Sequence, residues 1–226
     1  MTEDEWLTCT DARPMLHFIA GTMTDRKSRL FAIACCRRIL HLCAARGRAA
    51  VDRAEQMAMG LLSPAEWSRS VDLERIGRDA AEACANQTLL SLGNVPREAA
   101  LECAEGSARV AGLAHAYALG TDQAWTVGRY AVMREELSAQ SDLLREIVGT
   151  PFFPVTIDLS WLSWQQETVR KIVESIDGDG TYQELPILAD ALEDAGCDDA
   201  EILAHCRSSG PHVRGCWVVD LLLDKQ

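Results

Sequence analysis

The sequence predicts an all-α protein, a helical bundle of about nine to ten helices with one short extended strap. Apolar residues recur at helical spacing through most of the 226 residues. Gly, Pro and N-cap residues divide the chain into segments of helical length. Hydrophobic residues make up 48% of the chain and charged residues 25%, which is the balance of a folded globular protein rather than a disordered one.

The first helices are expected before residue 60. Asp11 precedes a helix expected over 13–19, because its carboxylate can accept hydrogen bonds from the free amides of the first turn. A second helix is expected over 25–46, where apolar residues form a wide stripe, and Gly47 is expected to end it. An Ala- and Met-rich segment follows over 49–59.

The middle of the chain is expected to be helical and rich in alanine. Ser63 and Glu66 match a capping box, in which each side chain accepts a hydrogen bond from the other residue's backbone amide. Pro64 stands where a missing amide costs nothing, in the first turn of the helix that follows, and Pro96 is expected to open the next helix. The helices expected here cover 65–92, 96–119 and 123–148.

Composition changes at Gly149. The strap Pro151-Phe152-Phe153-Pro154 is expected to be extended, because residues before proline avoid helical geometry. We therefore expect an N-terminal helical bundle over 1–149 and a smaller C-terminal helical unit over 150–226 packed on it. A single continuous domain is the alternative.

The C-terminal segment is expected to contain four helices. Ser163 and Gln166 match a second capping box, which predicts a helix from there to residue 176, followed by a turn over 177–180. The last element, 212–223, has an apolar run that would also suit a buried strand, but no partner strand is visible. The remaining helices are expected over 185–195 and from Asp198 or Asp199 to Cys206.

The charge is strongly acidic and unevenly spread. The net charge is −12, and residues 151–226 carry 5 basic and 14 acidic groups. Such a chain repels phosphate backbones, so nucleic acid is not expected as a partner. The segment 26–53 is basic and includes Arg37 and Arg38, while 184–201 is acidic. These are interpreted as two helix faces docked on each other, or as a basic groove at Arg37 and Arg38 that binds an anionic ligand or partner.

The chain is expected to be cytoplasmic. Its first residues are acidic where a secretory signal would be basic and then apolar. No apolar run reaches the roughly 18 residues of a membrane span. Its nine cysteines are therefore expected to be reduced thiols.

Short motifs near both ends form a distinctive set. They are Glu5-Trp6-Leu7-Thr8-Cys9-Thr10-Asp11, DRKSRLFAIACCRR at 25–38, LPILADALEDAGC at 185–197, HCR at 205–207 and GPHVRGCWVVD at 210–220. The set resembles a multi-copy family of uncharacterised proteins in planctomycete bacteria of the Gemmata type. The family has similar ends around an Ala-rich helical middle and no known activity, so the resemblance implies a bacterial cytoplasmic protein and no particular reaction. The middle of this chain is less repetitive than the family's.

A Cys/His group near the C-terminus is a candidate metal site. It consists of His205, Cys206, His212 and Cys216, whose nitrogen and sulfur atoms are ligands that zinc prefers. His212 and Cys216 are four residues apart and would share a helix face. His205 and Cys206 are adjacent, so only one of them is expected to join. We expect instead that Cys216 is packed in the core, that the histidines satisfy turns and that no cofactor is bound, with a zinc site as the alternative.

The same region also allows a thiol-dependent enzyme. Cys216 would be the nucleophile, a neighbouring histidine the base and Asp220 the group that orients it. No sequence signature of a cysteine hydrolase surrounds any cysteine, so no catalytic residue is assigned.

The function expected from the sequence is a non-catalytic protein-interaction or regulatory module. Acidic helical surfaces are abundant and no motif specifies a reaction, so a protein partner, of basic charge, is the leading hypothesis. A metal-binding protein is the first alternative and a thiol-dependent enzyme the second. The sequence does not indicate the oligomeric state.

Overall fold

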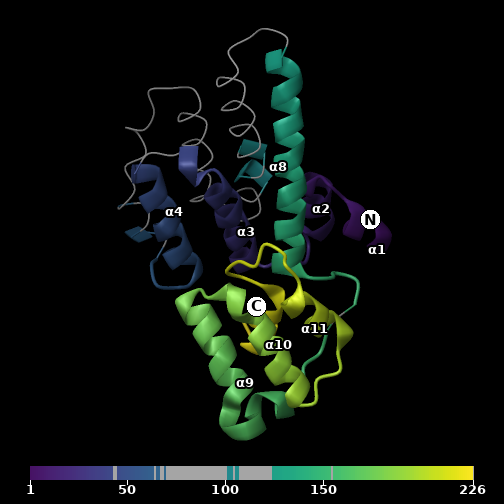
Figure 1. Cartoon of the computed structure of the whole chain (residues 1–226). Helices are drawn as coiled ribbons and strands as arrows, with labels where there is room; N and C mark the ends of the chain where they lie inside the picture. Colours follow the sequence, from purple (N-terminus) through teal and green to yellow (C-terminus); the bar gives the residue numbers. More distant parts are fainter. Residues whose placement is uncertain are drawn as a thin grey trace. The chain divides into compact units, whose positions relative to one another are not determined.

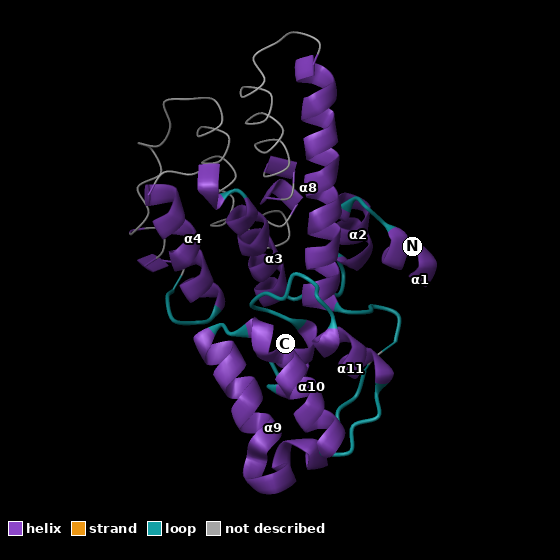
Figure 2. Cartoon of the chain, viewed as in Figure 1, coloured by secondary structure: helices purple, strands orange, loops and turns teal. Residues whose placement is uncertain are grey.

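The computed structural model describes residues 1–42, 45–63, 65–66, 69, 101–103, 105–106, 124–153 and 155–225. Among these residues every regular element is helical, with nine α-helices and two short 3₁₀ helices (Figure 2). The predicted all-α class is therefore confirmed. The chain divides into two compact units, Met1–Leu144 and Arg145–Gln226. This boundary falls inside a helix, slightly before the predicted one at residue 149.

The N-terminal unit begins with four α-helices (Figure 1). Asp11 caps the second of them as predicted, accepting a hydrogen bond from the Arg13 amide. The first helix was not predicted, although Thr2 and Glu5 form a reciprocal capping box that marks its start. The elements are α1 (Glu3–Thr8), α2 (Ala12–Ile19), α3 (Asp25–Arg38), the 3₁₀ helix η1 (Leu40–Leu42) and α4 (Ala45–Ala58).

Helix α3 is shorter than predicted. It ends at Arg38, and Gly47, the predicted terminator, lies inside α4. Ile39 leaves helical geometry (φ −101°, ψ 7°) and is 1% exposed, so the chain turns where this side chain enters the core. A glycine inside a helix costs only about 1 kcal/mol, which packing of α3 against α4 can offset.

In the middle of the chain, the structure describes two of the predicted features, the capping box at Ser63 and the helix that ends before Gly149. Ser63 and Glu66 form the expected capping box, with the Glu66 amide 3.3 Å from the Ser63 hydroxyl. The helices predicted over 65–92 and 96–119 lie almost entirely outside the described residues. Helix α8 (Ala124–Val148) ends where predicted, and Gly149 follows it with φ +71°.

The C-terminal unit contains the last turn of α8 and five further elements. Helix α10 packs against α9 and α11, and α12 packs against α9. The elements are α9 (Leu159–Asp179), the 3₁₀ helix η3 (Tyr182–Glu184), α10 (Leu185–Asp194), α11 (Ala200–Arg207) and α12 (Trp217–Leu222). The core they enclose includes Trp161, Leu162, Val169, Val173, Ile176, Leu185, Leu188, Leu192, Ile202, Cys206, Val218, Val219 and Leu222.

The strap between α8 and α9 is non-helical in residues 149–153 and 155–158, as predicted. Helix α9 differs from its prediction at both ends. It begins at Leu159, capped by Asp158, and the predicted box at Ser163 does not form. Residues 165–167 instead make a left-handed turn inside α9. The helix then continues through the predicted turn to Asp179, where Gly180 ends it with φ +71°.

Helices α10 and α11 match their predictions, and Asp199 caps α11 through the amides of Glu201 and Ile202. The last element is a helix rather than a strand, but it begins at Trp217 instead of residue 212. Residues 208–216 therefore form a loop between α11 and α12. Two of the predicted metal ligands, His212 and Cys216, lie in this segment, which we call the ligand loop.

Candidate metal centre

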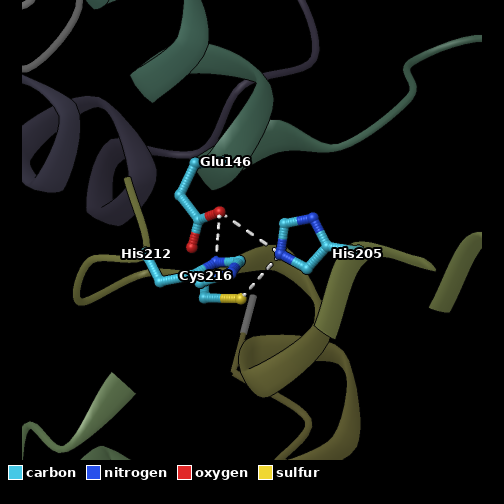
Figure 3. Close-up of side chains that lie close together, drawn as sticks. All are labelled: Glu146, His205, His212 and Cys216. Atoms are coloured by element: carbon cyan, nitrogen blue, oxygen red, sulfur yellow. Dashed lines mark hydrogen bonds and ion pairs between the residues drawn. The ribbon is translucent and has the colours of Figure 1, made fainter. Parts of the chain in front are cut away.

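Four side chains of the C-terminal unit converge on one point (Figure 3). They are Glu146, His205, His212 and Cys216. One ligand atom from each lies within 4.8 Å of all the others. Glu146 Oε2 is 3.0 Å from His212 Nδ1 and 3.2 Å from His205 Nε2, and His205 Nε2 is 3.2 Å from Cys216 Sγ.

The four residues come from separate segments of the chain. Glu146 lies in the last turn of α8 and His205 in α11. His212 lies in the ligand loop, and Cys216 is the N-cap residue of α12. The packing of the C-terminal unit, rather than a local sequence motif, therefore assembles the group.

Glu146 is a buried carboxylate whose side chain is only 3% exposed. Its Oε1 atom accepts a hydrogen bond from the Val213 amide at 3.3 Å, so both oxygens are engaged. Burial alone would raise the pKa of Glu146, but hydrogen bonds from His205 and His212 lower it below its ordinary value. Glu146 therefore contributes one negative charge to the group.

His212 is held at both ring nitrogens. Its Nδ1 atom faces Glu146, and its Nε2 atom lies 3.1 Å from the carbonyl oxygen of Ser208. A carbonyl only accepts, so Nε2 carries a proton. The hydrogen bond to Glu146, opposed by burial, raises the pKa of His212. Without a metal, His212 is thus the natural counter-ion of Glu146.

His205 is oriented by Trp217. The indole Nε1–H donates to His205 Nδ1 at 3.0 Å. Because Trp is only a donor, Nδ1 has a free lone pair and the proton of the neutral ring lies on Nε2. This proton points to Glu146 and Cys216. In this arrangement all four side chains have hydrogen-bond partners.

Cys216 is fully buried. Burial first, and the charge of Glu146 second, raise the pKa of the Cys216 thiol well above its ordinary value. A protonated thiol is a poor nucleophile, which disfavours the thiol-enzyme hypothesis. Asp220, the orienting group in that hypothesis, is not one of the four clustered residues.

The geometry suits a tetrahedral metal ion. Zinc binds nitrogen and oxygen at about 2.0–2.2 Å and sulfur at about 2.3 Å, which places the ligand atoms of a tetrahedron about 3.3–3.6 Å apart. Three of the six pairs of ligand atoms, at 3.0–3.2 Å, are close to this spacing, and the other three pairs lie within 4.8 Å. One carboxylate, one thiolate and two neutral imidazoles would balance the charge of a divalent ion.

Three of the four metal ligands predicted from the sequence come together: His205, His212 and Cys216. Cys206 is not part of the group, and it packs fully buried in the core of the C-terminal unit. Burial raises its pKa to about 12. The sequence left open whether His205 or Cys206 joins the group, and in the structure it is His205 that does.

Glu146 was missed by the sequence analysis. It lies one turn from Leu143 and beside Ile147, both buried, so a carboxylate occupies the apolar face of α8. An acidic residue on such a face requires a partner, because an isolated buried charge is costly. An acidic residue on an apolar helix face was therefore the sequence signal that could have pointed to Glu146.

Arg37 and Arg38, the predicted anion-binding residues, are paired within the N-terminal unit. Arg37 forms ion pairs with Asp52 and Glu55 of α4. Arg38 Nε lies 2.8 Å from Oε1 of Glu136 in α8. These contacts engage both guanidinium groups, and the ion pairs tie α3 to α4 and α8.

Comparisons with models of protein families, with curated proteins and with solved structures each found no match. The likeness to the planctomycete family stays a prediction. In the described part of the chain, no helix combines the length and the apolar character needed to cross a bilayer.

Proposed function

We propose that the C-terminal unit binds one zinc ion through Glu146, His205, His212 and Cys216, and that the ion stabilises the fold rather than performing a reaction. The observation that supports this proposal is the convergence of four ligand atoms within 4.8 Å from four separate segments.

The donor set favours zinc over other common divalent ions. Magnesium and calcium select oxygen ligands in sites of six or more donors, whereas this group offers one oxygen, two nitrogens and one sulfur. Copper(II) and nickel(II) favour square-planar arrangements. Four mixed donors around one point match the tetrahedral geometry of zinc.

Two features favour a structural role. Four protein ligands complete a tetrahedral zinc sphere, whereas catalytic zinc sites keep one position open for water or substrate. The donors are also shielded, with Glu146 and His212 side chains 3% and 9% exposed. A structural ion would join the end of α8, α11 and the start of α12.

The interaction module predicted from the sequence stays a prediction. It is compatible with a structural zinc ion, since a metal-stabilised unit can present a helical surface to a partner. Two acidic residues of α10, Asp190 and Glu193, already form ion pairs with Arg207 in the same unit. The identity and charge of any partner therefore need a binding experiment.

Zinc content of the purified protein tests the proposal. The full chain is expressed without an affinity tag in zinc-supplemented medium, and zinc is measured by mass spectrometry after gel filtration. The wild type should carry one zinc ion per chain and His212→Gln should carry almost none. The matched control is His17→Gln, because His17 is an exposed histidine on α2 and should not affect zinc.

A wild-type protein that is purified without zinc, and that takes up none when it is added, would overturn the proposal. Far-UV circular dichroism of His212→Gln separates loss of the site from loss of the fold.

A further inference from the structure

The ligand loop has an irregular backbone, although it carries two of the four proposed ligands. Residues 208–216 contain no helix, yet they hold both His212 and Cys216. A flexible loop would lose conformational entropy on metal binding, and that loss would weaken affinity. Contacts that order the loop before the metal binds would reduce this loss and so raise the affinity.

Arg214 lies between these two ligands and points to another helix. Its Nη1 atom donates a hydrogen bond of 2.5 Å to the backbone carbonyl of Asp177, near the end of α9. The same atom lies 3.7 Å from Asp177 Oδ1. Arg214 therefore joins the middle of the ligand loop to the C-terminal end of α9 by a charged contact and a hydrogen bond.

Asp177 is a buried anchor for this contact. Its side chain is 7% exposed. Oδ1 accepts a hydrogen bond of 3.2 Å from the Tyr182 hydroxyl, and Oδ2 forms an ion pair with Lys225. The carboxylate is thus fixed by three groups from three segments, which makes it a rigid point of attachment.

We propose that Asp177 and Arg214 are a positioning pair that holds the ligand loop in the conformation that binds metal. Neither residue is one of the four ligands, so both act through the loop. This inference rests on the proposed zinc function. It adds that the loop is ordered before the metal arrives, and that this order sets the affinity.

The test replaces Arg214 by Met, which keeps an unbranched side chain with an apolar stem and removes the guanidinium group. Arg207→Met is the matched control, because Arg207 also joins two segments through two carboxylates but lies outside the ligand loop. Arg214→Lys restores the positive charge without the planar fork and should recover part of the effect.

The first measurement is hydrogen–deuterium exchange of the metal-free full chain. The amides of Val213 and Cys216 are hydrogen-bonded, to Glu146 and to the Val213 carbonyl respectively. Peptides covering 208–216 should exchange faster in Arg214→Met than in the wild type or Arg207→Met. Unchanged exchange in this segment would overturn the inference, whatever the zinc result.

The second measurement is the zinc Kd, obtained by competition with a chromophoric chelator well below the unfolding temperature. Loss of a group that orients ligands weakens metal binding by about 10- to 100-fold, and Arg214→Met should fall in this range. A purely structural role would lower the unfolding temperature but leave the Kd of the folded chain unchanged. A Kd close to the wild-type value would therefore overturn the inference, whereas a wild type that binds no zinc would overturn the proposed function itself.

Discussion

The Nδ1 atom of His212 lies 3.0 Å from the Oε2 atom of Glu146, across 66 positions of sequence. Glu146 is buried, so its charge requires a positive neighbour. In a metal-free chain the neighbour is the His212 imidazolium, and in a zinc-loaded chain it would be the ion. Glu146 thus keeps its charge in both states, and the group that neutralises it changes from an imidazolium to the metal ion.

Glu146→Gln should weaken zinc binding by more than tenfold, because a neutral amide oxygen replaces the carboxylate at nearly the same volume. The Kd is measured by chelator competition. Glu136→Gln is the matched control, since Glu136 is another buried carboxylate on α8, paired with Arg38 instead of the histidines. The control should lose stability but bind zinc as the wild type does. Equal zinc affinity in the two variants would argue against Glu146 as a ligand.

Cys216→Ala and Cys206→Ala should behave differently, although both remove a fully buried thiol. Cys216→Ala should lose stoichiometric zinc, whereas Cys206→Ala should keep it and lose only packing energy. Cobalt(II) gives an independent measure, because a thiolate ligand produces a sulfur-to-cobalt charge-transfer band in the near ultraviolet. We expect this band in the wild type and in Cys206→Ala. Its persistence in Cys216→Ala would contradict the assignment.

Trp217 should report on metal binding. Its indole N–H donates to His205 Nδ1. A neutral histidine that binds zinc through Nε2 carries its proton on Nδ1, so this hydrogen bond must break when zinc binds. Zinc should therefore change the fluorescence of Trp217, measured as the difference between the wild type and Trp217→Phe. Trp217→Phe should bind zinc at least as tightly as the wild type, and a tenfold loss would show that the hydrogen bond persists in the bound state.

Zinc should stabilise the C-terminal unit reversibly. A ligand that binds only the folded state adds about 2.7 kcal/mol to the free energy of unfolding at one hundred times its Kd. Thermal melts of the wild type should show one transition that rises with zinc and falls when EDTA is added. His212→Gln should show no such shift. A zinc-dependent shift of the same size in that variant would mean that the ion binds elsewhere.

Arg38→Glu should destabilise the protein by at least about 2 kcal/mol more than Arg37→Glu. Arg38 neutralises the buried Glu136, so a second carboxylate there leaves an uncompensated buried charge. Arg37 pairs with Asp52 and Glu55, which are 61% and 23% exposed, and such surface pairs contribute about 0–1 kcal/mol each. Chemical denaturation of the two variants measures the difference. Similar losses would mean that Glu136 is solvated.

Three helix starts were predicted correctly because their signals are local, whereas the start of α1 was missed and that of α9 was misplaced. Each of these three starts has a capping side chain, which accepts a hydrogen bond from a backbone amide no more than three residues away: Asp11, Ser63 and Asp199. A stretch of four residues is therefore enough to recognise such a start. Helix ends were less predictable. Gly47 lies within α4, because packing outweighs the small cost of a helical glycine.

The proposed metal ligands were likewise predictable only in part. His205, His212 and Cys216 are close in sequence and have the residue types of a zinc site, so they could be proposed together. The argument that His212 and Cys216 share a helix face was wrong, since both precede α12 and meet through the turn of the ligand loop. Glu146 could not be placed from spacing, because it reaches the cluster only through the packing of α8 in the C-terminal unit.

The most direct test of the account is X-ray absorption spectroscopy of the zinc-loaded full chain. The account predicts four-coordinate zinc with one sulfur at about 2.3 Å and three nitrogen or oxygen atoms at about 2.0–2.2 Å. A six-coordinate shell of oxygen and nitrogen without sulfur would contradict it.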